Sequence, residues 1–495
     1  MVCVLFRLST YEICHGVIES FKSTFDYIRL NSVLTSGEMC GLALGMNCAL
    51  EVTKNLNWTI ALPERINRIN FYAKTVKRWK NVAHITDIHY DPQYTVGTTA
   101  DCYEPVCCRK SPNLFSSIST SAGLFGNYLH CDTPSSTVKK SIDRMLNSHR
   151  LSYVIWTGDI PPHDIWNYKR TSTSMYISEV HQMLNEIKVP VFPAVGNHEA
   201  VPVNSFAPPE IDESLSNAWL YEKLASMWSK WLPKGAIQNV KHTGNYAVRL
   251  EPGLRIISLN TNYCARLNPW ILYKSIDPGN QLKWLVEQLL NAENAGDRVH
   301  LIGHVPPDHK ECTQPWLFNF VRIVQRFRDT ITAQFYGHTH RDEFRVLYDS
   351  ERKNDAIGFE LIGPSITTYS GTNPSYRIYK INENNIVIDY ETYTFNLTES
   401  HLRGEPMWYL EYKASSLLNI NTISATTLHE ALKSLESNSS FYSSYHRVYY
   451  TRSDVDYALR WNDRRRALLI DSHKVMKPNV AQPFSSQYQK LNCYV

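Results

Sequence analysis

Between about residues 81 and 400, short apolar runs alternate with longer stretches in which apolar positions recur at helical spacing. The apolar runs predict strands over 81–86, 153–156, 190–195, 254–259, 299–302 and 333–336. The helical spacing predicts helices over 137–149, 174–188, 217–231, 280–295 and 315–328. Strands and helices that alternate in this way are typical of an α/β fold with a layered α/β/α core.

The two ends of the chain show a different pattern. From Cys14 to Leu34, apolar side chains at positions 17, 18, 21, 25 and 28 predict an amphipathic helix. Its apolar face would either pack on the rest of the protein or lie against lipid. We therefore expect four parts: a small helical unit over 1–50, a basic connector over 51–80, the α/β domain over 81–400 and a helical C-terminal region over 401–495.

The composition is that of a globular protein. Hydrophobic residues make up 43% of the 495 residues and charged residues 20%, which excludes a disordered chain. A net charge of +4 gives no indication of a nucleic-acid partner. No run approaches the roughly 18 apolar residues of a membrane-spanning helix. The first apolar run stops at Arg7 without a small-residue cleavage site, so a signal peptide is not predicted.

The cysteines, in contrast, indicate an oxidising compartment. Cys102, Cys107, Cys108 and Cys131 form a group that would either bind zinc or form disulfides. The group lacks a C-x2-C pair on both sides, which favours disulfides in a secreted or lysosomal protein. Three glycosylation sequons agree with this interpretation, at Asn57, Asn396 and Asn438.

Side chains that bind metals follow five of the predicted strands. Glycine precedes most of them and would let the chain turn sharply as it leaves each strand. In an α/β sheet, residues at the carboxyl ends of adjacent strands meet at one edge. The five segments are Asp87-Ile88-His89, Gly158-Asp159, Gly196-Asn197-His198-Glu199, Gly303-His304 and Gly337-His338-Thr339-His340.

Seven of these side chains suffice for two metal ions if Asp159 bridges them. A shell that mixes imidazole and oxygen ligands suits Zn²⁺ better than Mg²⁺ or Ca²⁺. Two such ions activate a water and hold phosphate oxygens, which predicts phosphoester hydrolysis. One ion would have Asp87, His89, Asp159 and His340, and the other Asp159, Asn197, His304 and His338.

Two further histidines are candidates for the proton that the leaving oxygen needs. His198 follows Asn197 directly, and His163 lies four residues after Asp159 in a loop stiffened by two prolines. Asp164, the next residue, could orient the imidazole of His163.

With these residues in place, the chain resembles the calcineurin-like metallophosphoesterases and, more closely, the acid sphingomyelinase family. The motifs that carry the resemblance are Thr86-Asp87-Ile88-His89-Tyr90 and residues 156–161, 193–199, 204–206, 334–340, 364–365 and 367–369. The resemblance implies a zinc-dependent enzyme, monomeric, that cleaves sphingomyelin to ceramide and phosphocholine at membrane surfaces, in lysosomes or outside the cell. It assigns two Zn²⁺ to the seven ligands above and the proton-transfer roles to His163 and His198.

The resemblance also implies disulfides and a partial N-terminal domain. The implied pairs are Cys102–Cys107, Cys108–Cys131 and Cys264–Cys312. Residues 1–50 resemble the end of a saposin-type lipid-binding domain, in which Cys3 would pair with Cys14 while Cys40 and Cys48 lack their partners. We therefore expect a truncated N-terminus. Two alternatives are a related phosphodiesterase that acts on nucleotides or other soluble phosphoesters, and an inactive lipid-binding product.

Overall fold

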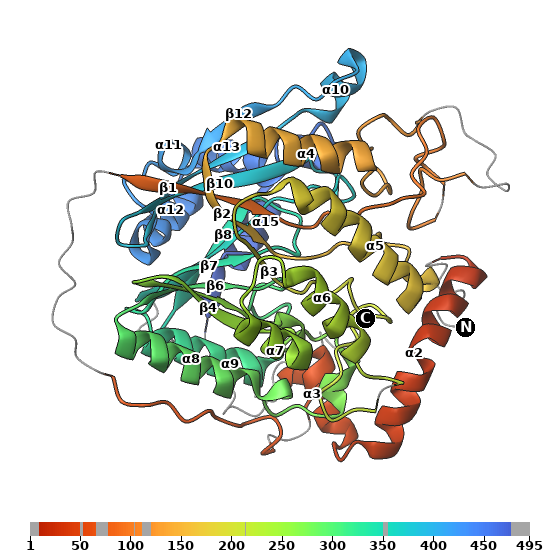
Figure 1. The fold of residues 1–495 in the computed structure, drawn as a ribbon. Helices are drawn as coiled ribbons and strands as arrows, with labels where there is room; N and C mark the ends of the chain where they lie inside the picture. Colours follow the sequence, from red (N-terminus) through yellow and green to blue (C-terminus); the bar gives the residue numbers. More distant parts are fainter. Residues whose placement is uncertain are drawn as a thin grey trace.

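Two mixed β-sheets form the centre of the protein (Figure 1). The computed structural model describes residues 9–49, 53–65, 78–102, 104–110, 120–212, 214–349 and 355–476. The six-stranded sheet has the order β12 (Tyr409–Lys413), β11 (Val387–Thr394), β10 (Ser375–Asn382), β1 (Trp79–Ile85), β2 (Leu151–Trp156), β3 (Val191–Pro193). The seven-stranded sheet has the order β13 (Lys474–Met476), β8 (Glu343–Tyr348), β9 (Ala356–Ile362), β7 (Ile331–Tyr336), β6 (Arg298–Ile302), β5 (Leu254–Ser258), β4 (Tyr246–Glu251).

Buried apolar side chains join the two sheets into one core. Phe335 on β7 packs its ring 4.8 Å from Tyr379 on β10 and edge-on to His84 on β1. The hydroxyl of Tyr153 on β2 lies 3.1 Å from a ring nitrogen of His300 on β6, so these two buried polar groups are paired. The layer between the sheets is therefore closed by large, well-packed side chains.

Helices cover the outer faces of both sheets. In Figure 1, α4 (Ser135–Ser148) lies on the side of the first sheet, and α8 (Gln281–Ala295) and α9 (Gln314–Arg326) lie on the opposite side, against the second. The remaining helices of the α/β region are α5 (Arg170–Met183), α6 (Ala218–Trp228) and α7 (Lys234–Thr243). Those that follow it are α10 (Leu397–Arg403), α11 (Ala414–Leu418), α12 (Ala425–Ser437), α13 (Ser439–Tyr449), α14 (Asp456–Leu459) and α15 (Asp463–Ser472).

The α/β fold class is confirmed, with one difference in layering. All six predicted strands and all five predicted helices are present, but the strands are divided between two sheets. Sequence periodicity does not say which strands pair, so a single sheet and a pair of stacked sheets give the same pattern. The C-terminal region is mainly helical and also supplies β12 and β13, each at the edge of a sheet.

The predicted N-terminal helix is α2 (Tyr11–Asn31), followed by α3 (Ser36–Leu44). Thr10 caps α2, because its hydroxyl accepts a hydrogen bond from the backbone N–H of Ile13. Ile28 is buried against Trp270, whereas the apolar residues Ile18 and Phe25 are 53% and 49% exposed. One face of the helix therefore packs on the protein, another is exposed, and contact of that exposed face with lipid stays a prediction.

The connector runs along α9 over its described part, residues 53–65. The side-chain oxygen of Asn319 accepts a hydrogen bond from the backbone N–H of Ile60, and Arg326 donates to the carbonyl oxygens of Pro63 and Glu64. Residues 51–52 and 66–77 of the predicted connector lie outside the described residues, and its last two residues already belong to β1. Within the described ranges, none of the helices combines the length and the apolar character that crossing a membrane requires.

Candidate metal centre

The seven candidate ligands lie in loops that follow five parallel strands, three in one sheet and two in the other. Asp87 and His89 follow β1, Asp159 follows β2, Asn197 follows β3, His304 follows β6, and His338 and His340 follow β7. Five of them have positive φ angles between 41° and 73°, a conformation that non-glycine residues adopt rarely and chiefly at functional sites. These five are Asp87, His89, Asp159, His338 and His340.

The glycines before these ligands serve two purposes. Gly158 has a φ of 89°, as a sharp turn after β2 requires. Gly196 and Gly337 do not have positive φ angles, so the predicted turn is not their role. A Cβ on Gly196 would lie 2.2 Å from Asp159 Oδ1, and one on Gly337 would lie 2.0 Å from Thr86 Oγ1. These two glycines instead let neighbouring loops approach closely.

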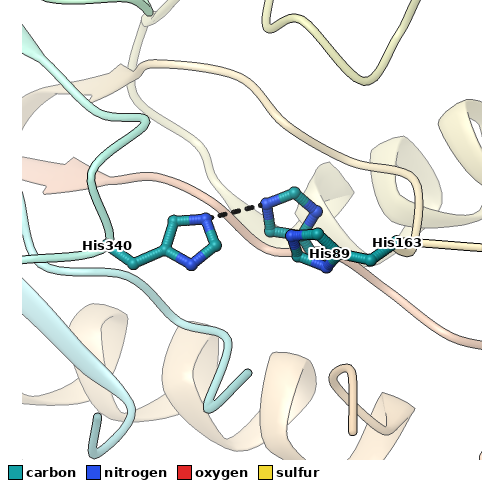
Figure 2. A group of neighbouring side chains, drawn as sticks. All are labelled: His89, His163 and His340. Carbon is teal, nitrogen blue, oxygen red and sulfur yellow. Dashed lines mark hydrogen bonds between the residues drawn. The ribbon is translucent and has the colours of Figure 1, made fainter. Parts of the chain in front are cut away.

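Four of the candidate ligands form a first cluster. His89 Nε2 lies 3.1 Å from His340 Nε2 (Figure 2) and 3.4 Å from Asp159 Oδ2. His340 Nε2 lies 3.4 Å from Asp87 Oδ1. All four side chains are buried. Two imidazole nitrogens and two carboxylates that converge at such distances provide a mixed shell for a divalent cation.

The other candidate ligands form a second cluster around the same aspartate. His304 Nε2 lies 3.1 Å from Asp159 Oδ2 and 2.8 Å from Asn197 Oδ1. His338 Nδ1 lies 3.0 Å from the same Asn197 oxygen. Because Asp159 Oδ2 contacts a histidine of each cluster, this carboxylate is in position to bridge two ions. The structure thus brings together the two ligand sets that the sequence predicts.

The outer ring nitrogens of the histidines are held by hydrogen bonds. Nδ1 of His89 lies 2.8 Å from the carbonyl oxygen of Pro161, and Nδ1 of His304 lies 2.6 Å from that of Thr157. A carbonyl only accepts, so both rings carry their proton on Nδ1 and present Nε2 as a ligand. His338 is reversed: Nε2 faces Glu311 Oε2 at 3.3 Å, and Nδ1 faces the cluster.

Burial and neighbouring charges shift the pKa of several candidate ligands, mostly toward the protonation states that bind a cation. Burial lowers the pKa of His89 and His340, which favours the neutral imidazoles that metals bind. Burial alone would raise the pKa of Asp159, but the neighbouring His304 and His198 hold it well below its ordinary value. Burial alone would lower the pKa of His338, but the hydrogen bond and charge of Glu311 raise it to about 9, so metal binding here displaces a proton.

The two candidate proton-transfer histidines both lie at the site. His163 stacks between the rings of His89 and Tyr369, with centroid distances of 4.0 and 3.9 Å (Figure 2 shows His89, His163 and His340). His198 lies 4.7 Å from His163, centroid to centroid, and its backbone N–H donates to Asp159 Oδ1. Both rings are therefore adjacent to the first cluster.

The residue that orients His163 is Asp132, and the suggestion of Asp164 was wrong. His163 Nδ1 lies 2.7 Å from Asp132 Oδ1, and its backbone N–H donates to Asp132 Oδ2 at 2.6 Å. Asp164 instead accepts from Nη1 of Arg109 at 2.7 Å. Asp132 lies 31 residues before His163, so no local spacing in the sequence pointed to it.

His198 is held in a single tautomer by Tyr168. The Tyr168 hydroxyl donates to the carbonyl oxygen of Pro162 at 2.5 Å, and its oxygen lies 2.8 Å from His198 Nδ1. Since the hydroxyl proton is committed to Pro162, His198 Nδ1 donates and Nε2 is left as an acceptor. Burial lowers the pKa of His198 to about 3, which keeps this ring neutral.

Three disulfides brace the loops around the site. Cys102–Cys107, Cys108–Cys131 and Cys264–Cys312 are present, which confirms the pairs that the resemblance implies. Cys14 is disulfide-bonded, and its expected partner Cys3 lies outside the described residues. Within the part of the chain that the structure describes, Cys40 forms no disulfide.

Two of the three predicted glycosylation sites are exposed. Asn57 and Asn438 are accessible, and Asn438 also caps α13 through its side-chain oxygen. Asn396 is half-buried, and its Nδ2 donates to Asp454 at 2.9 Å. Modification at all three positions stays a prediction.

Comparison with known proteins agrees with the fold. Residues 80–342 match the family model of the calcineurin-like phosphoesterases, and residues 362–458 match that of the acid sphingomyelin phosphodiesterase C-terminal region. The first match defines the class: the chain is a calcineurin-like phosphoesterase with a site for divalent metal ions.

Curated relatives narrow this class. The chain is 38% identical to human sphingomyelin phosphodiesterase over 91% of its own length and 72% of that protein. It is 35% identical to sphingomyelin phosphodiesterase 2 of Caenorhabditis elegans, over 91% and 78% of the two chains. A human cyclic GMP-AMP phosphodiesterase is 32% identical over 71% and 78%. The chain belongs to the acid sphingomyelinase family of phosphodiesterases.

Proposed function

We propose that this protein hydrolyses sphingomyelin to ceramide and phosphocholine at a two-zinc centre. The observation that carries the proposal is the pair of ligand clusters that share Asp159, in a chain 38% identical to human sphingomyelin phosphodiesterase. The relative that acts on cyclic GMP-AMP matches 71% of the chain, and sphingomyelin phosphodiesterases match up to 91%. This difference favours the lipid substrate.

The donor set supports zinc. Each proposed ion would have two imidazole nitrogens together with carboxylate or amide oxygens. Mg²⁺ and Ca²⁺ prefer shells made of oxygen, whereas borderline cations such as Zn²⁺ accept nitrogen ligands readily. We assign Asp87, His89, Asp159 and His340 to one ion and Asp159, Asn197, His304 and His338 to the other.

The residues of the site have separate tasks in this proposal. When bound, two zinc ions would supply Lewis acidity toward the phosphate oxygens and lower the pKa of a water. Asn197 contributes a neutral oxygen, so it completes the ligand set without adding negative charge beside an anionic substrate. Asp159 fixes the relation between the two ion positions, since a single oxygen faces both clusters.

We assign the general acid to His163. Departure of ceramide requires a proton on its leaving oxygen. His163 Nδ1 lies 2.7 Å from Asp132 Oδ1, which holds the ring in place beside the first cluster, and the His163 side chain is 16% exposed. His198 has its Nδ1 proton engaged by Tyr168, so we assign it a role as hydrogen-bond acceptor through Nε2.

We further propose that the substrate is met at a membrane surface and that the protein works as a monomer in the lysosome or outside the cell. The outward apolar side chains of α2 support membrane contact by the unit over 1–50, which we take as a partial saposin-like domain. Three disulfides support an oxidising compartment. In this proposal the domain over 81–400 carries out the reaction, and the helical region over 401–495 supports that domain.

The first experiment compares two substrates at mildly acidic pH with added Zn²⁺. One sample contains sphingomyelin in anionic liposomes and the other a soluble nucleotide. We expect phosphocholine release with little nucleotide turnover; turnover of the nucleotide alone would overturn the lipid assignment.

Asp159→Asn should abolish hydrolysis and reduce bound zinc at both positions, because the shared carboxylate is weakened. Asp143→Asn, an exposed change on α4, is the matched control.

A further inference from the structure

The outer nitrogen of His340 differs from those of His89 and His304 in what holds it. The latter two donate to main-chain carbonyl oxygens, which no substitution of a side chain removes. Nδ1 of His340 lies 2.9 Å from the side-chain hydroxyl of Ser370. The orientation of this imidazole therefore depends on one side chain from a loop 30 residues further along the chain.

The loop that carries Ser370 is fastened to the C-terminal helices. The hydroxyl of Tyr457, on α14, donates to the carbonyl oxygen of Ser370 at 2.7 Å. Nη1 of Arg341 donates to the same oxygen at 3.0 Å. The Arg341 guanidinium lies 4.5 Å above the ring of Tyr450, which in turn lies 5.2 Å from the ring of Tyr457.

A glycine makes this contact possible. Gly371 follows Ser370 with a φ of 69°, and a Cβ at this position would lie 1.9 Å from the Tyr457 hydroxyl oxygen. A side chain at residue 371 would therefore push Tyr457 away from the Ser370 carbonyl. The absence of a side chain at residue 371 thus allows the close approach of α14 to the loop.

We infer that Ser370 is a positioning residue for the candidate ligand His340, and that Tyr457 holds Ser370 in place. His340 Nε2 points toward Asp87 and His89, so when Nε2 ligates a metal ion the neutral ring would carry its proton on Nδ1 and donate it to Ser370 Oγ. This hydrogen bond fixes both the tautomer and the plane of the ring. The C-terminal region thereby takes part in holding the metal. The inference rests on the proposed metal centre, because it takes His340 as a ligand.

The test measures zinc affinity directly, by competition with a chromophoric chelator and elemental analysis of the recovered protein. We expect Ser370→Ala to weaken zinc binding by about 10–100-fold, the usual effect of losing such a partner. Ser370→Thr retains a hydroxyl and should restore most of the affinity. Tyr457→Phe should weaken binding in the same direction but less, since Arg341 still donates to the Ser370 carbonyl.

Two controls separate this inference from the proposed function. His340→Ala should lose zinc at one position; if it keeps both ions, the proposed ligand set is wrong. Tyr450→Phe keeps the ring beneath Arg341 and leaves the Ser370 contacts in place, so its zinc affinity should equal that of the wild type. If Ser370→Ala binds zinc as tightly as the wild type while His340→Ala does not, the positioning role is overturned and the metal centre stands. If Ser370→Ala does not fold, the zinc affinity of Tyr457→Phe is the deciding measurement. An affinity equal to that of the wild type would contradict the role of α14.

Discussion

At the scale of single residues, the two histidines beside the ligand clusters are distinguished by their hydrogen-bond partners. The Asp132 carboxylate accepts from His163, whereas the Tyr168 hydroxyl oxygen accepts from neutral His198. The sequence placed both histidines near the ligands but gave no reason to separate them. Their partners come from other loops, and those contacts exist only in the folded protein.

This difference predicts that His163→Ala lowers the rate of sphingomyelin hydrolysis by about 10²–10⁴, the usual contribution of a general acid. Zinc content should stay that of the wild type, because His163 is not among the proposed ligands. The measurement combines kcat with elemental analysis of the same preparation.

Asp132→Asn provides the matched variant for His163. It keeps the shape of the side chain but replaces the carboxylate that orients the His163 ring with an amide, so kcat should fall, though less than in His163→Ala. Loss of zinc in His163→Ala would contradict its assignment as the acid and would make it a ligand.

At the scale of elements, a buried aspartate ties the β4–β5 hairpin to the start of β6. Asp297 Oδ2 accepts from Arg255 Nε at 2.7 Å, and Oδ1 accepts from Arg249 and from the Gly253 backbone N–H. Burial alone would raise the pKa of Asp297, but these hydrogen bonds lower it below the ordinary value for a carboxyl group. The folded state therefore favours the ionised form more than the unfolded state does.

We expect Asp297→Asn to lower the free energy of unfolding by roughly 1–3 kcal/mol at neutral pH. Because the pKa is lower in the folded state, this stabilisation is fully present above the ordinary carboxyl pKa, about 4. It is lost as the pH falls through the lowered folded value. Denaturation followed at several pH values should show the wild type and the variant converging as the solution becomes more acidic.

An exposed aspartate serves as the reference for this series. Asp143→Asn on α4 removes the same charge from the surface and should leave the unfolding free energy within about 0.5 kcal/mol at every pH. A constant difference between wild type and Asp297→Asn down to the most acidic condition would contradict the proposed ionised state of Asp297.

At the scale of the whole molecule, the catalytic region and the N-terminal helix are held together by apolar packing. Tyr27 and Ile28 of α2 pack against Trp270, which follows β5 in the second sheet. Ile18 and Phe25 lie seven residues apart, on one face of the helix, and both are about half exposed. The side of α2 that does not pack on the protein thus offers an apolar surface.

We expect the double variant Ile18→Ser with Phe25→Ser to hydrolyse sphingomyelin in liposomes roughly tenfold more slowly at limiting lipid, since partial burial of two apolar side chains is lost. Hydrolysis of a small soluble phosphodiester should be unchanged, because neither residue belongs to the ligand clusters. Parallel assays measure the ratio of the rate on sphingomyelin liposomes to the rate on the soluble phosphodiester.

Leu402→Ser is the comparison for surface hydrophobicity in general, because Leu402 on α10 is 85% exposed. It should behave as the wild type on both substrates. Equal slowing on the soluble substrate in the double variant would contradict a role in membrane contact and indicate a damaged fold.

The α/β class, the ends of the main strands and the seven candidate ligands could be predicted from the linear sequence. This was possible because each ligand follows an apolar run within a few residues, and such local spacing survives in a linear pattern. The disulfides Cys102–Cys107, Cys108–Cys131 and Cys264–Cys312 were reached through family resemblance.

The way in which these pieces combine became clear from the folded protein. The division of the strands into two sheets, the contact of His89 with His340 across 251 residues, and the choice of Asp132 over Asp164 depend on packing between distant segments. The same holds for the link from Tyr457 through Ser370 to His340. Local periodicity reports which face of an element is buried, but partners far apart in the chain are selected by the shape and charge of the folded core.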